Sequence, residues 1–239
     1  MKYNKITCCK YTLDKISLEY CLNHCQTRYV FYYYSLVVTV SSTSLFIMSA
    51  TAVLKFIHEI KSVWSRSDNE EAQNRAEKLS GILDNGIPIF DEWENELKCD
   101  PPSVNFTTIN TSSELSNTKN KKIYSALVEA FDSMPWKHPR QLSNSLTDIL
   151  GGEDKFKSAM LIGTRKLGAV IESNEMYLGL TYLSPGTTYP QHAHDATELY
   201  FTILGSALWG PSMRHLKIVT PGNFVLHSSA QPHAFQVNK

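Results

Sequence analysis

The chain has 239 residues, of which 42% are hydrophobic, and its 23 Lys and Arg residues are balanced by 23 Asp and Glu residues. This length suffices for one barrel domain with an accessory region. A chain without net charge, and without a run of basic residues among aromatic ones, lacks the surface expected of a nucleic-acid-binding protein. The same balance gives no support for binding to a membrane surface through charge.

The N-terminal segment differs in composition from the rest of the chain. Residues 29–54 contain no Asp, Glu, Lys or Arg and are long enough to span a bilayer, but five Ser and three Thr dilute them. A signal anchor, an organelle-targeting stretch and sequence outside the functional protein are the three interpretations. We favour the last, because a segment of different composition begins at Met48. Residues 1–47 are therefore predicted to be a leader or upstream extension, and the protein is predicted to be cytoplasmic, with membrane anchoring through 29–54 as the alternative.

The next part of the chain shows helical periodicity. Apolar residues recur at helical spacing over 51–64, and a second helix is predicted over 69–83 with Ser67 or Asp68 as its cap. Residues 100–120 are rich in Ser, Thr and Asn and indicate a linker, after which 121–134 form an amphipathic pattern that ends before Pro135. We therefore predict a helical N-terminal region with its linker over 48–119, and a barrel domain over 120–239.

The C-terminal half contains short runs typical of strands. They cover 158–162, 176–183, 198–204, 207–209, 216–219 and 223–226. Strands of this length and spacing predict a mainly β fold with a barrel of the jelly-roll type. Because the sequence stops six residues after His233, we expect the barrel to lack its last strands.

Two groups of residues in this half have the spacing of a metal site. The first reads Gly186-x5-His192-x-His194-x3-Glu198-x6-Gly205, and the second reads Gly222-x10-His233. Three imidazoles and one carboxylate suit a divalent transition metal, namely Fe, Zn, Mn, Ni or Cu. A single histidine is more often a core or surface residue than a ligand, but two separated groups that match one template argue for metal binding.

Strand periodicity supports this assignment. Alternate residues of a strand face the same way, so His192 and His194 are expected to point into the barrel together. Glu198 and Tyr200 share their even numbering, although Asp195 and Ala196 are placed to interrupt the strand. Tyr200 is therefore a further candidate for the inner face. His215 and His227 match no ligand position and are interpreted as ordinary histidines.

These two groups resemble the two motifs of the cupin superfamily, of which the first supplies two His and a Glu and the second a His. Ser228, Ala230 and Val237 depart from common residues of the second motif, but none is a ligand position. The stretch from Tyr189 to Tyr200, followed by Ala207-Leu-Trp209-Gly, is similar to the cupin dimethylsulfoniopropionate lyases.

The resemblance implies a β-elimination. A metal held by His192, His194, Glu198 and His233 would bind the substrate carboxylate, and a tyrosinate would remove the α-proton so that dimethyl sulfide leaves and acrylate remains. By family position Tyr200 is the first choice of base, or an auxiliary ligand, and Tyr189 is the second. Tyr189 and Trp209 are also candidates to contact the sulfonium group, with core packing as the alternative. Phe201 has an odd number, unlike Glu198 and Tyr200, so strand alternation predicts that it faces away from the barrel interior.

Other functions remain open at this point. The same ligands would serve another metal-dependent cupin enzyme, such as an isomerase or a dioxygenase, or a small-molecule-binding module without catalysis. Tyr200 favours the lyase. The expected partner is a small-molecule substrate and not a nucleic acid, and the sequence leaves a homodimer open.

Overall fold

The computed structural model describes residues 42–86, 99–106, 118–137, 150 and 152–237. From Ala50 onward these residues belong to one compact unit. The predicted leader over 1–47 lies almost wholly outside the described residues, as does most of the predicted linker over 100–120. Those two assignments therefore stay predictions.

The three predicted helices are present. They are α3 (Ser42–Ser65), α4 (Glu70–Asn85) and α6 (Thr118–Ala130). The side chains of Val53, Ile57, Ile60 and Trp64 are all buried, as their helical spacing predicted. Helix α3 begins earlier than expected, and α6 ends earlier, with the 3-10 turn η4 (Phe131–Ser133) filling the predicted span before Pro135.

The cap of α4 differs from the prediction. Asn69, and not Ser67 or Asp68, is the N-cap, because its side-chain oxygen accepts a hydrogen bond from the backbone N–H of Ala72 at 2.9 Å. All of these residue types can cap a helix, so composition alone does not choose between neighbours. The helix ends at Asn85, directly before Gly86 and two residues later than the predicted end at 83.

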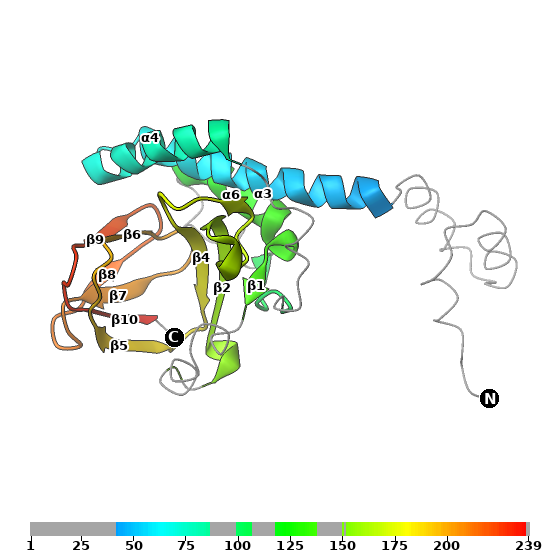
Figure 1. Cartoon of the computed structure of the whole chain (residues 1–239). Coiled ribbons are helices and arrows are strands. Elements are labelled where there is room, and N and C mark those ends of the chain that lie inside the picture. The colour runs from blue at the N-terminus through cyan, green and yellow to red at the C-terminus, as the bar shows by residue number, and fades with distance from the viewer. Residues whose placement is uncertain (1–41, 87–98, 107–117, 138–149, 151, 238–239) are drawn as a thin grey trace, which may run out of the picture. The chain divides into compact units, whose positions relative to one another are not determined.

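The strands form three groups of paired neighbours (Figure 1). The first contains β1 (Trp136–Lys137), β2 (Phe156–Gly163), β3 (Ile171–Glu172) and β4 (Leu178–Leu183), with both β3 and β4 paired to β2. The second has the order β5 (Thr188–His192), β10 (His233–Val237), β7 (Ala207–Gly210) and β8 (Lys217–Val219). The third pairs β6 (Glu198–Phe201) with β9 (Phe224–His227). The fold is mainly β with a helical N-terminal region, as predicted.

Four strands were not predicted, namely β1, β3, β5 and β10. Strands β1 and β3 contain only two residues each, which is too short for a recognisable alternation, and β5 contains Pro190. Strand β6 ends at Phe201 and not at Leu204, and the chain turns at Gly205 with a φ of 68°. A positive φ of this kind is easily adopted by glycine, so Gly205 marks a turn as predicted.

An apolar core joins the helices to the first sheet. Phe56 and Leu79 from the helices and Trp136, Leu161 and Ile162 from β1 and β2 all have 0% exposure and belong to the same cluster. Figure 1 shows α3, α4 and α6 together along one side of the strands, with α4 above β6 and β9. Burial on both faces explains why β2 is apolar at nearly every position. This core holds the first sheet in place, and β5 to β10 extend from it.

Candidate metal centre and active site

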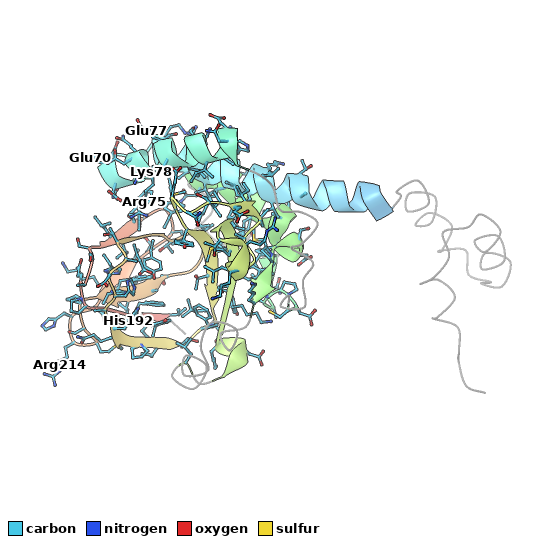
Figure 2. All side chains as sticks on the ribbon, viewed as in Figure 1. Glu70, Arg75, Glu77, Lys78, His192 and Arg214 are labelled. Atoms are coloured by element: carbon cyan, nitrogen blue, oxygen red, sulfur yellow. The ribbon has the colours of Figure 1, made fainter. Side chains whose placement is uncertain are left out.

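The four predicted ligands come from neighbouring elements at the ends of strands. His192 is the last residue of β5 and His233 is the first of β10, and the two are direct partners in the antiparallel register. Glu198 is the first residue of β6, and His194 lies in the loop that leads to it. Figure 2 labels His192 at the edge of this group of strands. The fold therefore brings both sequence groups together.

The ligand atoms converge. Nitrogen atoms of His192, His194 and His233 all lie within 4.8 Å of one another. Oε2 of Glu198 lies 3.2 Å from Nε2 of His194 and 3.5 Å from Nε2 of His233. The carboxylate therefore lies beside two of the three imidazoles that the sequence spacing indicated.

The expected geometry was wrong in one respect. His192 and His194 do not alternate along one strand, because β5 ends at His192. Glu198 and Tyr200 do share a face, but on the separate strand β6. The backbone turns between β5 and β6. His194 is therefore placed near Glu198 by the loop, and not by the alternation of side chains along one strand.

Backbone carbonyl groups orient two of the imidazoles. Nδ1 of His192 is 2.9 Å from the carbonyl oxygen of Pro190, and Nδ1 of His233 is 2.9 Å from that of Gln231. A carbonyl only accepts hydrogen bonds, so Nδ1 carries a proton, and in the neutral form of each ring the lone pair is on Nε2. Metal-binding histidines usually have such a partner on the second nitrogen.

These residues fit a divalent transition metal. Nε2 of the buried His233 has no hydrogen-bond partner in the described part of the chain, although a buried nitrogen normally has one. Burial lowers the pKa of His192, chiefly by disfavouring the charged imidazolium, and so favours the neutral form that binds metals. The chemistry of the donors and their convergence agree with each other.

Tyr200 is directly attached to this set. Its hydroxyl donates a hydrogen bond of 2.8 Å to Oε2 of Glu198. Burial, reinforced by the negative charge of Glu198, raises the pKa of Tyr200 far above its usual range, so the phenol holds its proton in the chain alone. The second candidate, Tyr189, has its pKa raised mainly by burial as well, and its ring centre lies 4.6 Å from that of His192.

Three aromatic rings on neighbouring strands form a ladder across the sheet. Phe235 of β10 is the register partner of both Tyr189 on β5 and Trp209 on β7. Its ring stacks on Tyr189 at 5.0 Å and on Trp209 at 4.2 Å between centres. The ring centre of Tyr200, on β6, lies 4.7 Å from that of Trp209, so Tyr200 packs against this ladder. Phe201 instead contacts Phe224 on the opposite side, as its numbering predicted.

Sequence reasoning missed two residues of this region. Phe235 was not considered, although it follows His233 by two positions and lies on the same strand. His227 was interpreted as an ordinary histidine, but it is 3% exposed and its ring stacks on His233 at 4.2 Å. Burial lowers its pKa to about 4. Its placement follows from pairing with Glu198 across β6 and β9, which sequence spacing does not reveal.

A helix contributes to the loop before Glu198. Nη2 of Arg75, on α4, donates to the backbone carbonyl oxygen of Thr197 at 3.2 Å, and its Nε donates to Glu71 at 2.8 Å. Figure 2 shows Arg75 on the side of α4 that is turned toward the strands. The helical region therefore contacts the backbone next to a candidate ligand.

Comparison with known proteins identifies the family. The model of the dimethylsulfoniopropionate lyase family matches residues 103–239, which is more than half of the chain. This chain belongs to that family. The resemblance drawn from the two motifs is therefore confirmed. Among curated proteins, the dimethylsulfoniopropionate lyase DddQ of Ruegeria pomeroyi is 30% identical over 121 residues, which cover 51% of this chain and 57% of that protein. The chain thus matches little more than half of this relative's length.

A solved structure of a lyase has a similar fold. The crystal structure of DddQ from Ruegeria pomeroyi is 23% identical, covers 79% of this chain and 86% of its own, and has a TM-score of 0.53. Another structure, from work on the lyases RdDddP and RnDddQII, has 16% identity, covers 80% and 88%, and has a TM-score of 0.49. The DddQ likeness supports the predicted cupin fold for this family member.

The described helices also bear on the predicted alternatives for the N-terminal segment. Over the ranges that the structure describes, none of the helices combines the length and apolar character that crossing a bilayer requires. Residues 29–41 lie outside those ranges.

Proposed function

We propose that this chain is a metal-dependent carbon–sulfur lyase that cleaves dimethylsulfoniopropionate to dimethyl sulfide and acrylate. Its membership of the lyase family supports the substrate class. The observation that carries the proposal is the hydrogen bond between Tyr200 and Glu198, because it attaches a candidate base to the ligand set. The proposal includes a cytoplasmic location and a functional protein that begins near Met48.

His192, His194, Glu198 and His233 would hold the metal. A bound divalent cation would supply Lewis-acid chemistry, by attracting the substrate carboxylate and lowering the pKa of the nearby phenol. Hydrogen bonds from the Nδ1 atoms of His192 and His233 to backbone carbonyl groups would leave their Nε2 atoms for the metal. The identity of the metal is left open between Fe, Zn, Mn, Ni and Cu.

Tyr200 would act as the base. Its phenolate oxygen would take the proton from the carbon next to the carboxylate, and the freed electron pair would form the carbon–carbon double bond. The carbon–sulfur bond breaks in the same elimination, dimethyl sulfide leaves as a neutral molecule, and acrylate keeps the carboxylate. Glu198 positions Tyr200 through the 2.8 Å hydrogen bond. Tyr189 beside His192 would orient the substrate.

The direct test is detection of dimethyl sulfide in the gas phase above metal-loaded protein given dimethylsulfoniopropionate. 3-(Methylthio)propionate is the matched control, because it has the same carboxylate but a poorer leaving group without positive charge, and its elimination would release methanethiol together with acrylate. We expect dimethyl sulfide from the first compound, no methanethiol from the second, and neither product from protein treated with a chelator. Absence of dimethyl sulfide with every one of the five metals would refute the proposal.

A further inference from the structure

Two residues beside the ligand set have buried nitrogen atoms without partners. Nε1 of Trp209 and both ring nitrogens of His227 make no hydrogen bond within the described part of the chain. Most buried polar atoms in folded proteins are paired, so an unpaired group calls for a physical reason. Trp136 shows the ordinary situation in the same molecule, because its Nε1 donates to the carbonyl oxygen of Phe131 at 2.7 Å.

The unpaired groups lie next to the residues of the proposed reaction. The ring of His227 stacks on His233 at 4.2 Å with 13° between the planes. The ring of Trp209 lies 4.7 Å from Tyr200 and 5.8 Å from His227. One residue comes from β7 and the other from β9, so both groups of strands contribute to this position.

The chemistry of these groups selects the kind of partner. An indole N–H only donates, and an imidazole carries at least one N–H in either protonation state. A hydrogen-bond acceptor would therefore pair with Nε1 of Trp209 and with the N–H of His227. Phe235 covers one face of the Trp209 indole by stacking on it at 4.2 Å between ring centres. A ligand is therefore expected at the N–H edge of the indole and not on this face.

We propose that Trp209 Nε1 and His227 form a subsite that donates hydrogen bonds to the carboxylate of the small-molecule ligand. The proposal rests on the lyase assignment for its choice of ligand. It revises the predicted role of Trp209, which was contact with the sulfonium group. The aromatic rings must move slightly apart to admit the carboxylate, as they must for any partner of the equally covered Nε2 of His233.

The first test needs no substitution. Acrylate is added to zinc-loaded, 15N-labelled full-length protein, and the indole N–H signals are followed by NMR. We expect the Trp209 signal to shift as it gains an acceptor, while Trp64 and Trp136 stay unchanged. Trp64 is a suitable control because its Nε1 is also buried without a partner in the described ranges, but it lies on helix α3. An unmoved Trp209 signal at high acrylate, or an equal shift with trimethylsulfonium, would overturn the subsite.

The second test measures affinity with matched variants. Trp209→Phe and His227→Phe keep a ring but remove the nitrogen atoms, and each should raise the dissociation constant for acrylate by roughly tenfold or more, as for hydrogen bonds to a charged group. Trp64→Phe should not change it. Bound zinc, measured by elemental analysis, should be equal in all samples. Unchanged acrylate affinity in both site variants would reject the subsite.

Release of dimethyl sulfide by the same samples separates this inference from the lyase assignment. Wild-type protein that releases none, yet binds acrylate through Trp209 and His227, would keep the subsite and reject the lyase. Wild-type protein that releases it, while both variants bind acrylate normally, would keep the lyase and reject the subsite.

Discussion

The apolar core and the ligand region of this protein differ in the kind of side chain that each buries. In the core, side chains such as Phe56, Leu79 and Leu161 are fully buried and belong to one hydrophobic cluster. In the ligand region, between β5, β10 and β7 on one side and β6 and β9 on the other, His227 and His233 are also buried but have nitrogen atoms without partners among the described residues. Such atoms cost stability when nothing binds them.

This difference indicates that the apolar core stabilises the fold and that the ligand region serves binding. Each fully buried apolar side chain contributes about 1.5–3 kcal/mol to folding, so the core supplies stability without chemistry. The ligand region gives up part of that stability to keep donors and acceptors available. A substitution in one region should therefore change stability with little effect on binding, and a substitution in the other should do the reverse.

The largest expected effect is on stability, from Leu161→Ala in β2. Leu161 is 0% exposed, so its loss leaves a cavity in the core and should cost about 2–5 kcal/mol in the free energy of unfolding. Leu226→Ala is the matched control, because Leu226 is 44% exposed on β9 and should cost less than about 0.5 kcal/mol. Urea denaturation measures both. Loss of bound metal from folded Leu161→Ala protein would break the separation between the regions.

The next effect is on metal binding, from His194→Ala or Glu198→Ala. Each removes one of four ligands and should weaken metal affinity by more than about 100-fold, since even outer partners of ligands contribute 10–100-fold. Elemental analysis after dialysis measures it, with His215→Ala as the control because His215 is exposed and outside the site. The free energy of unfolding of the metal-free protein should change little in either variant. Undiminished metal in both variants would refute the ligand assignment.

Turnover should respond to Tyr200→Phe. The substitution keeps the ring beside Trp209 but removes the hydroxyl bound to Glu198, and should lower the rate of dimethyl sulfide release by roughly 100-fold or more, as for loss of a general base. Bound metal should stay constant. Tyr189→Phe should cost less, because that residue is proposed only to orient the substrate. A normal rate for the first variant with a large loss for the second would exchange their roles.

Sequence spacing selected the four candidate ligands and Tyr200, which the fold brings close together, because motif residues are few and their chemistry is specific. It also predicted α3, α4 and α6 and six of the ten strands in the part of the chain that the structure describes, since these are long or regular enough to show periodicity. It could not predict that His194 lies outside a strand, nor that His227 lies against His233. Both depend on which strands pair and in what register, and this pairing cannot be inferred from residues that are neighbours in sequence.

The smallest expected effect tests the contact between the two regions, through Arg75→Ala. Arg75 on α4 donates to the carbonyl oxygen of Thr197, directly before Glu198. Its loss should cost about 0.5–1.5 kcal/mol of stability, as for one hydrogen bond. Because the same contact fixes the backbone beside a ligand, metal affinity should also fall, by roughly threefold to tenfold, which is about 0.7–1.4 kcal/mol.

Lys78→Ala is the matched control for this variant, since Lys78 is an exposed cationic residue on the same helix. It should alter neither quantity, so a drop shared by both variants would mean that the positive charge of α4 matters and the contact does not. Titration of metal-free protein with zinc, followed by urea denaturation, measures affinity and stability on the same sample. If Arg75→Ala lowers stability while zinc affinity stays at the wild-type value, the helix supports the barrel without positioning Glu198. The two regions would then be independent even where they touch.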